Sequence, residues 1–461
     1  MLAAKAVEQE REKRKRFGAL LGFVLLSITL GILHAGSPQV AMEGVFTLVL
    51  HHGISPTDAF AIGGIGGALV NSGLVALIGI IAYGITGTDI GSGEVSAMLM
   101  MYGYAFYGKT IFNVVPLLLG VYLYAYAIKE PLTQNSALAC YSTALGPVVS
   151  TIAFDIDYLG PGTPLAITIG ILVGLGSGAL IANLSKHMRI LIRGNNMYVG
   201  GFTAGVVGVL VNSILKSIGL GHGPVENAPV VDQNYRMLLV GIAAVLFLYF
   251  IVIGFLLDRR LPYAIKLLVS EKPRRDYCLS HGFPVALMSI GMMGLVALGY
   301  FLLIPNTIMH GQIWAGMFTV AAFSVIGLTP RYMYPFVLGM VVSSFLSAAL
   351  KGHILGEGIL VTGMAGISSV ATVMATMVGC GMSPLAERFG VFRSMLIGII
   401  YSQIVPNLAV LHGWMNTYNS GFALGLVIIL YFTGESKTMK AEIDLYNRLN
   451  KYGFLEKMDP K

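Results

Sequence analysis

The chain has 461 residues, of which 56% are hydrophobic and 11% charged, and its formal net charge is +7. An ordinary soluble domain carries about 25% charged residues, so this composition excludes a soluble globular protein and indicates a polytopic membrane protein. Cys140, Cys278 and Cys380 have no paired spacing, which excludes a disulfide framework or a cysteine metal motif.

Basic residues open the chain and precede its first apolar run. Residues 1–16 are rich in Lys and Arg, and the apolar run 17–34 follows. Lys and Arg beside a membrane span mark the cytoplasmic side. We therefore expect residues 1–16 to be a cytoplasmic N-terminus, with a positive charge that sets topology and binds no nucleic acid.

Apolar runs that approach the length of a membrane span recur along the chain. A helix of about 20 apolar residues crosses a bilayer, so we expect an all-α integral membrane protein with about 12 to 14 transmembrane helices. Residues 40–50 are either an interfacial or a re-entrant helix. The predicted crossings are 17–34, 60–84, 92–107, 109–127, 134–154, 164–185, 197–217, 237–257, 284–304, 310–328, 332–350, 357–378, 393–411 and 416–433.

A carboxylate follows the break after the second span. Glu94 lies in Gly-Ser-Gly-Glu-Val, and Gly311-Gln312-Ile313 stands at the matching place later in the chain. A glycine and a polar residue that open a short apolar segment are expected of a half-helix whose free N–H groups face a polar cavity. Glu94 is our candidate for proton or cation coupling, with Gln312 as its counterpart. The alternative is an ordinary first-turn carboxylate that the helix dipole favours.

A lysine opens the run 109–127. A charge at the bilayer centre costs about 2.5 to 3.5 kcal/mol on insertion scales, so it usually needs a partner or a water-filled path. Lys109 therefore either snorkels to the membrane interface or lines a solute path beside Asn113. Thr110 follows it, and Thr329 stands at the matching place in the second half, so both threonines are further path candidates.

The chain repeats itself at an offset of 416 − 196 = 220 residues. The motif Asn-x-Tyr-x-x-Gly-Phe-x-x-Gly begins at Asn196 and again at Asn416, which places Tyr198 and Tyr418 in equivalent positions. One interpretation is helix capping by Asn and helix packing through glycine. The other places both segments at a pseudo-twofold interface, with these four polar side chains facing the solute.

Seven crossings in each half would place the halves in opposite senses, as an inverted repeat with broken half-helices. The charges agree, since residues 186–193 are basic whereas the matching stretch 412–414 carries no Lys or Arg. The predicted organisation is a first membrane repeat at 17–220, an external linker at 221–235, a second membrane repeat at 236–433 and a cytoplasmic amphipathic tail at 434–461.

The duplicated motifs, with the ending from Leu411 to Phe422, resemble an uncharacterised family of bacterial multi-pass membrane proteins, a domain of unknown function. The resemblance covers nearly the whole chain. It implies a location in the bacterial inner membrane and supplies neither a substrate nor site residues.

Two related membrane halves are typical of secondary transporters. We expect a transporter of a small polar or ionic solute, with alternating access between the halves and coupling to protons or cations. A passive channel or facilitator lined by Asn196 and Asn416 is the alternative. A membrane-embedded enzyme or assembly partner is weaker, because the chain has no nucleotide-binding, catalytic or metal motif. The expected partners are the lipid bilayer and the solute, without a cofactor, and homo-oligomerisation stays open.

Overall fold

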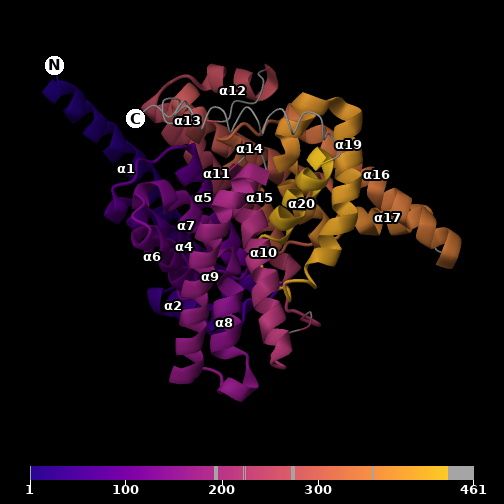
Figure 1. Cartoon of the computed structure of the whole chain (residues 1–461). Coiled ribbons are helices and arrows are strands. Elements are labelled where there is room, and N and C mark those ends of the chain that lie inside the picture. The colour runs from indigo at the N-terminus through magenta and orange to yellow at the C-terminus, as the bar shows by residue number, and fades with distance from the viewer. Residues whose placement is uncertain are drawn as a thin grey trace.

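The computed structural model describes residues 2–191, 196–221, 223, 225–270, 276–355 and 358–433, and this part of the chain is helical without a β-strand (Figure 1). In a bilayer every backbone N–H and C=O needs an internal partner, which a helix supplies within one segment. The expected all-α integral membrane class is confirmed. The predicted tail at 434–461 lies outside the described residues.

The α-helices follow the repeat in the sequence. Those of the first half are α1 (Leu2–Ala35), α2 (Pro38–Leu50), α3 (Ala59–Ile62), α4 (Gly64–Thr86), α5 (Ser92–Tyr104), α6 (Val114–Ala127), α7 (Ser136–Ser142), α8 (Gly146–Phe154), α9 (Pro164–Leu191) and α10 (Asn196–Ser217). Those of the second half are α11 (Arg236–Leu257), α12 (Leu261–Ser270), α13 (Tyr277–Ser280), α14 (Phe283–Leu303), α15 (Gly311–Ser324), α16 (Pro330–Leu355), α17 (Ile359–Ser368), α18 (Val370–Gly379), α19 (Ser383–Leu408) and α20 (Asn419–Thr433).

Short 3₁₀ helices join several of these elements. They are η1 (Ala105–Tyr107), η2 (Leu132–Asn135), η3 (Thr143–Leu145), η4 (Asp157–Leu159), η5 (Gln233–Tyr235) and η6 (Cys380–Met382). Through η2 and η3, helices α7 and α8 form one broken segment long enough to cross a bilayer.

Nine helical segments of the described chain are long and apolar enough to cross a bilayer, or ten if α17 and α18, which bend by 64° at their junction, form one span. The sequence led us to expect about 12 to 14 spans. The difference arises because α5, α6, α15 and α20 are each 15 residues or shorter. Such helices reach only part of the way through a bilayer.

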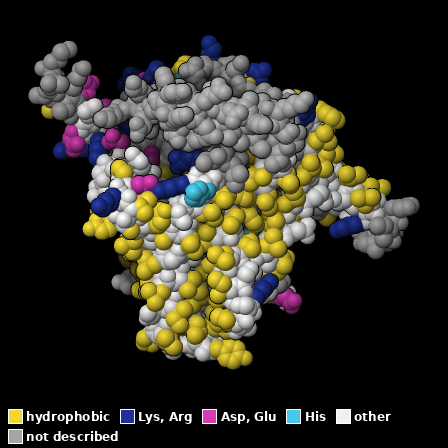
Figure 2. Space-filling view, viewed as in Figure 1, with side chains coloured by type: hydrophobic (Ala, Val, Ile, Leu, Met, Phe, Trp, Pro, Cys, Tyr) yellow, Lys and Arg dark blue, Asp and Glu magenta, His cyan; other side chains and the backbone are white. Residues whose placement is uncertain are grey.

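Figure 1 places α12 and α13 at one end of the helices, which we call the α12 face, and the connection from α8 to α9 at the other. Hydrophobic side chains cover the helix flanks between them, and most of the visible charged side chains lie toward the α12 face (Figure 2). An apolar flank with charges at its edge is the surface that a lipid bilayer requires.

Helices α5 and α6 form a hairpin that enters and leaves at the α12 face. The Tyr83 hydroxyl in the last turn of α4 donates to the Glu94 carbonyl in the first turn of α5, at 3.0 Å. Just beyond α4, the Thr88 hydroxyl lies 2.7 Å from that of Ser136, which follows α6 and η2. Both ends of the hairpin therefore lie beside the end of α4. The predicted crossings 92–107 and 109–127 are one re-entrant hairpin.

Helices α5 and α15 run antiparallel and cross at glycine. A Cβ atom on Gly103 would lie 2.5 Å from the Cβ of Phe318. Just beyond the C-terminal end of α5, in η1, the Phe106 carbonyl oxygen would lie 2.0 Å from a Cβ atom on Gly311. Small residues permit this close approach of backbones inside a membrane.

The repeated motifs meet where α10 crosses α20. A Cβ atom on Gly201 would lie 3.0 Å from the Cα of Gly421. The phenylalanine after each of these glycines covers a glycine of the other helix, so that Phe202 packs on Gly425 and Phe422 packs on Gly205. The repeated glycines therefore make the close helix contacts that the packing interpretation expects.

Candidate functional site

Lys109 lies in the turn between η1 and α6 and is 0% exposed. Its Nζ donates to the Thr143 hydroxyl at 2.8 Å and to the Tyr418 hydroxyl at 2.6 Å. This burial excludes the snorkelling alternative. Tyr418 belongs to the second half of the chain, so the lysine joins the two halves at a point inside the membrane domain.

The Lys109 amine has aromatic and hydroxyl neighbours but no acidic partner among the described residues, where it forms no ion pair. Nζ lies 4.2 Å from the centroid of the Tyr418 ring and 5.5 Å from that of the Tyr104 ring. The faces of aromatic rings attract cations. The site therefore offers the amine hydroxyl and ring contacts, but no counter-ion among the described residues.

Asn71, Thr110 and Asn113 fix the turn that carries Lys109. The Asn71 side chain donates to the Lys109 carbonyl at 2.9 Å. Asn113 accepts the Thr110 N–H at 2.9 Å and donates to the Gly108 carbonyl and the Ser150 hydroxyl, each at 2.9 Å. The polar groups of Asn113 are thus used within the protein. Thr110 and Asn113 support the lysine and form no solute-facing wall in this conformation.

Gly108 occupies a position that only glycine fits well. Its φ of +101° is in the left-handed region, and an added Cβ would lie 2.5 Å from the Gly53 carbonyl oxygen. Gly108→Ala is expected to lower the free energy of unfolding by about 2 to 4 kcal/mol, from the strained φ and the clash together. The apparent melting temperature in detergent measures the loss.

Gly87 is the matched control for this prediction. Its φ is +73°, and nothing lies within 4 Å of an added Cβ. Gly87→Ala should therefore cost only the strain of the left-handed backbone, about 1 to 2 kcal/mol. Equal losses in the two variants would show that the approach of Gly108 to Gly53 contributes nothing to stability.

Glu94 and Gln312 lie at opposite ends of the antiparallel pair α5 and α15. The Glu94 carboxylate, at the α12 face, accepts the Gly91 N–H at 3.0 Å and caps its own helix. Gln312 lies in the first turn of α15, where the His310 ring accepts its N–H at 3.0 Å. Each residue opens a short helix as expected, but the two side chains do not form one site.

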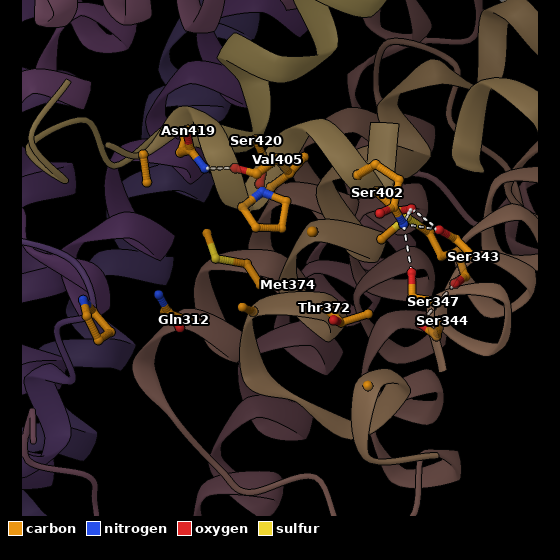
Figure 3. A pocket seen from close by; sticks show the side chains of 18 of the residues that line it. Gln312, Ser343, Ser344, Ser347, Thr372, Met374, Ser402, Val405, Asn419 and Ser420 are labelled. Carbon is orange, nitrogen blue, oxygen red and sulfur yellow. Dashed lines mark hydrogen bonds between the residues drawn. The ribbon is translucent and has the colours of Figure 1, made fainter. Parts of the chain in front are cut away.

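A cavity of about 520 Å³ opens beside Gln312 (Figure 3). Its wall is rich in hydroxyl and amide groups from α16, α18, α19 and α20. Gln403 donates to Ser343 at 2.6 Å and to Ser347 at 3.2 Å, and Ser402 also bonds to Ser343. The lining includes Ser55, Tyr107, Gln312, Ser343, Ser344, Ser347, Lys351, Thr372, Ser402, Gln403, Thr417, Asn419 and Ser420.

The cavity and the lysine site share two segments of chain. Tyr107 lines the cavity two residues before Lys109, and Thr417 lines it one residue before Tyr418. Thr417 is held in place because its N–H and hydroxyl donate to the Ala144 carbonyl, at 2.9 and 3.0 Å. A movement of Lys109 or Tyr418 would therefore shift a residue of the cavity wall that is only one or two positions away in the chain.

The other predicted path residues do not line the cavity, or their side chains lie outside the described residues. Asn416 is buried, and its Oδ1 accepts the Tyr418 N–H at 2.9 Å in the turn that precedes α20, which begins only at Asn419. Thr329 is buried just before α16 and does not line the cavity. The side chains of Asn196 and Tyr198 lie outside the described residues.

Sequence reasoning missed Thr143 and the hydroxyl groups of the cavity. Ser343, Ser344 and Ser347 stand within the predicted crossing 332–350, and Ser402 with Gln403 stands within 393–411. Clusters of polar residues inside apolar spans were the signal that could have pointed to this wall. No such signal marked Thr143, which became visible only through its contact with Lys109.

Comparison with known proteins gives a family without an assigned activity. No curated protein and no solved structure matches the chain. The model of a family described as "Protein of unknown function (DUF1576)" matches residues 37–217 and 263–433, which is more than half of the chain and includes both copies of the repeat. The chain, a multi-span helical membrane protein, therefore belongs to the DUF1576 family.

Proposed function

We propose that this protein is a secondary transporter of a small polar or ionic solute, which works by alternating access between its two halves. The observation that carries the proposal is the hydroxyl- and amide-lined cavity inside an apolar helical domain. Polar groups in a membrane interior are costly and usually mark a solute pathway. The cavity adjoins the contact of Lys109 with Tyr418, where the halves meet.

We further propose that the halves form an inverted repeat. Two reciprocal contacts support this arrangement. Asp58, which caps α3, accepts the Gly311 N–H at the start of α15 at 3.1 Å. Asp276, which caps α13, accepts the Ser92 hydroxyl at the start of α5 at 2.7 Å. In each half a helix-capping aspartate thus accepts a hydrogen bond from the first residue of a short helix of the other half, once from a backbone N–H and once from a hydroxyl. Such reciprocal contacts are expected of a twofold relation.

The proposal places the α12 face in the cytoplasm and the protein in the inner membrane. Lys13 donates to the Gly87 carbonyl, and Arg16 to the Ile90 carbonyl, both beside the end of α4 at that face. Basic residues beside spans favour the cytoplasmic side.

Uptake into proteoliposomes tests the transporter proposal. Purified protein is reconstituted, and the uptake of labelled urea, glycerol, acetate, nitrate, phosphate and methylammonium is compared with that of protein-free liposomes, with and without a pH gradient. A coupled carrier concentrates a solute, whereas a passive channel only equilibrates it. Uptake of every compound at the protein-free rate would overturn both forms of the proposal.

Glu94→Gln tests proton or cation coupling. The amide oxygen can still accept the Gly91 N–H, so the helix cap and the melting temperature are expected to persist. The ionisable proton is lost, so accumulation driven by a pH gradient should fall to equilibration. Glu43→Gln, in an exposed position on α2, is the control and should leave accumulation intact. Unchanged accumulation in Glu94→Gln would remove Glu94 from the coupling mechanism.

A further inference from the structure

We propose that the solute is a small anion and that Lys109 supplies the positive charge that draws it into the cavity. This inference rests on the proposed function, and it names the substrate class. Its basis is a buried lysine without a described acidic partner, next to a cavity whose described lining contains no Asp or Glu.

The buried charges of the interior do not balance near the cavity. Among the described residues, Lys109 and Asp58 are the only Lys, Arg, Asp or Glu side chains in the fully buried set. The Asp58 carboxylate accepts three backbone N–H groups, from Phe60, Val231 and Gly311, and does not line the cavity. These N–H dipoles thus stabilise the negative charge of Asp58 locally. The described hydrogen-bond and cation–π partners of the Lys109 amine are two hydroxyls and two aromatic rings, and none of them is an anion.

The cavity wall carries groups that can bind an anion. Hydroxyl and amide groups can donate hydrogen bonds to an oxyanion, and Figure 3 shows such groups of Ser343, Ser347 and Thr372 in the wall. The one charged residue in the described lining is Lys351, which is also a cation. In a medium of low dielectric constant a charge acts over longer distances than in water, so Lys109 can attract an anion without touching it in this conformation. Because hydroxyl and amide groups can donate as well as accept, a positive potential is what makes the cavity favour an anion over a cation.

Lys186, unlike Lys109, has an acidic partner among the described residues. Lys186, near the end of α9, forms an ion pair with Glu130 in the loop after α6. The bond from Lys186 holds the pKa of the Glu130 carboxyl below its usual value. That pair cancels its own charge at the membrane edge. Lys186 is therefore the matched control, a lysine that cannot add to the potential in the cavity.

The test measures the selectivity of uptake in the full-length protein. Proteoliposomes receive labelled acetate, nitrate or inorganic phosphate in one arm and labelled urea, glycerol or methylammonium in the other. We expect at least one anion to enter about tenfold faster than in protein-free liposomes, and Lys109→Met to remove most of this gain. Lys109→Arg, which keeps the charge, should retain the preference for anions, and Lys186→Met should leave uptake unchanged.

The outcomes separate this inference from the proposed function. Uptake of urea, glycerol or methylammonium without uptake of any anion would overturn the anion inference and leave a transporter standing. Anion uptake that is equal in wild type and Lys109→Met would remove Lys109 from the mechanism and overturn the inference as stated. The wild-type selectivity needs no variant, so it decides the substrate class even if Lys109→Met does not fold. Uptake of no compound would overturn the transporter proposal and the inference together.

Discussion

Gly178→Ala is expected to lower the apparent melting temperature, whereas Gly176→Ala, two residues earlier on the same helix, is expected to raise it. A Cβ atom on Gly178 would lie 2.1 Å from the Leu117 carbonyl oxygen and 3.1 Å from the Cα of Gly120. Helix α9 would then have to move away from α6, which costs about 1 to 3 kcal/mol or more. Nothing lies within 4 Å of a Cβ atom on Gly176, so alanine there gains about 0.5 to 1 kcal/mol of helix propensity.

Thermal unfolding in detergent, with both variants and wild type measured side by side, decides this prediction. Opposite shifts would show that the glycines of α9 serve the packing against α6. Similar shifts in both variants would contradict the contact. The second half offers an independent repetition, because Gly339 on α16 and Gly398 on α19 meet in the same manner, with a Cβ on Gly339 lying 3.1 Å from the Cα of Gly398.

Asp58→Asn is expected to destabilise the protein strongly, by about 2 to 4 kcal/mol. One carboxylate oxygen accepts the N–H groups of Phe60 and Gly311, and the other accepts that of Val231. An asparagine has only one oxygen, so its NH₂ group faces at least one N–H donor. A buried donor left without an acceptor costs much more than an exposed one, because water cannot replace the lost partner.

Asp232→Asn is the control for this substitution. Asp232 also caps a short helix, with its Oδ1 accepting the Asn234 N–H at 3.0 Å, but it is exposed to solvent. Its replacement should shift the melting temperature little, since asparagine is an equally good N-cap at an exposed position. If both variants melt at the same temperature, Asp58 does not hold the halves together.

The repeat could be predicted from the sequence, and so could the short segments near Glu94 and Gln312. Both predictions rest on local patterns, namely matching residues at a constant offset and a glycine beside a polar residue at the start of an apolar run. The return of α6 to the face where α5 enters could not be predicted in the same way. Hydropathy counts apolar residues, and a hairpin of two short helices is as apolar as two crossings.

The contact of Lys109 with Thr143 and Tyr418 could not be predicted, for a different reason. The sequence left Lys109 between the interface and a path, because a lysine beside a glycine fits both. Its partners Thr143 and Tyr418 lie 34 and 309 residues away along the chain. Only the packing of the halves brings these side chains together.

By itself the sequence determined that this protein is helical, lies in a membrane and is built from two related halves. Those properties follow from composition and from the spacing of residues along one chain, which act locally on each segment. The tertiary structure alone decided that Lys109 is buried between the halves and that Asn113 holds the turn that carries it. It also decided that serines of α16 and α19 line a cavity. Contacts between distant segments decide such features, because burial and hydrogen-bond partners depend on which helices pack together, not on which residues are neighbours in the chain.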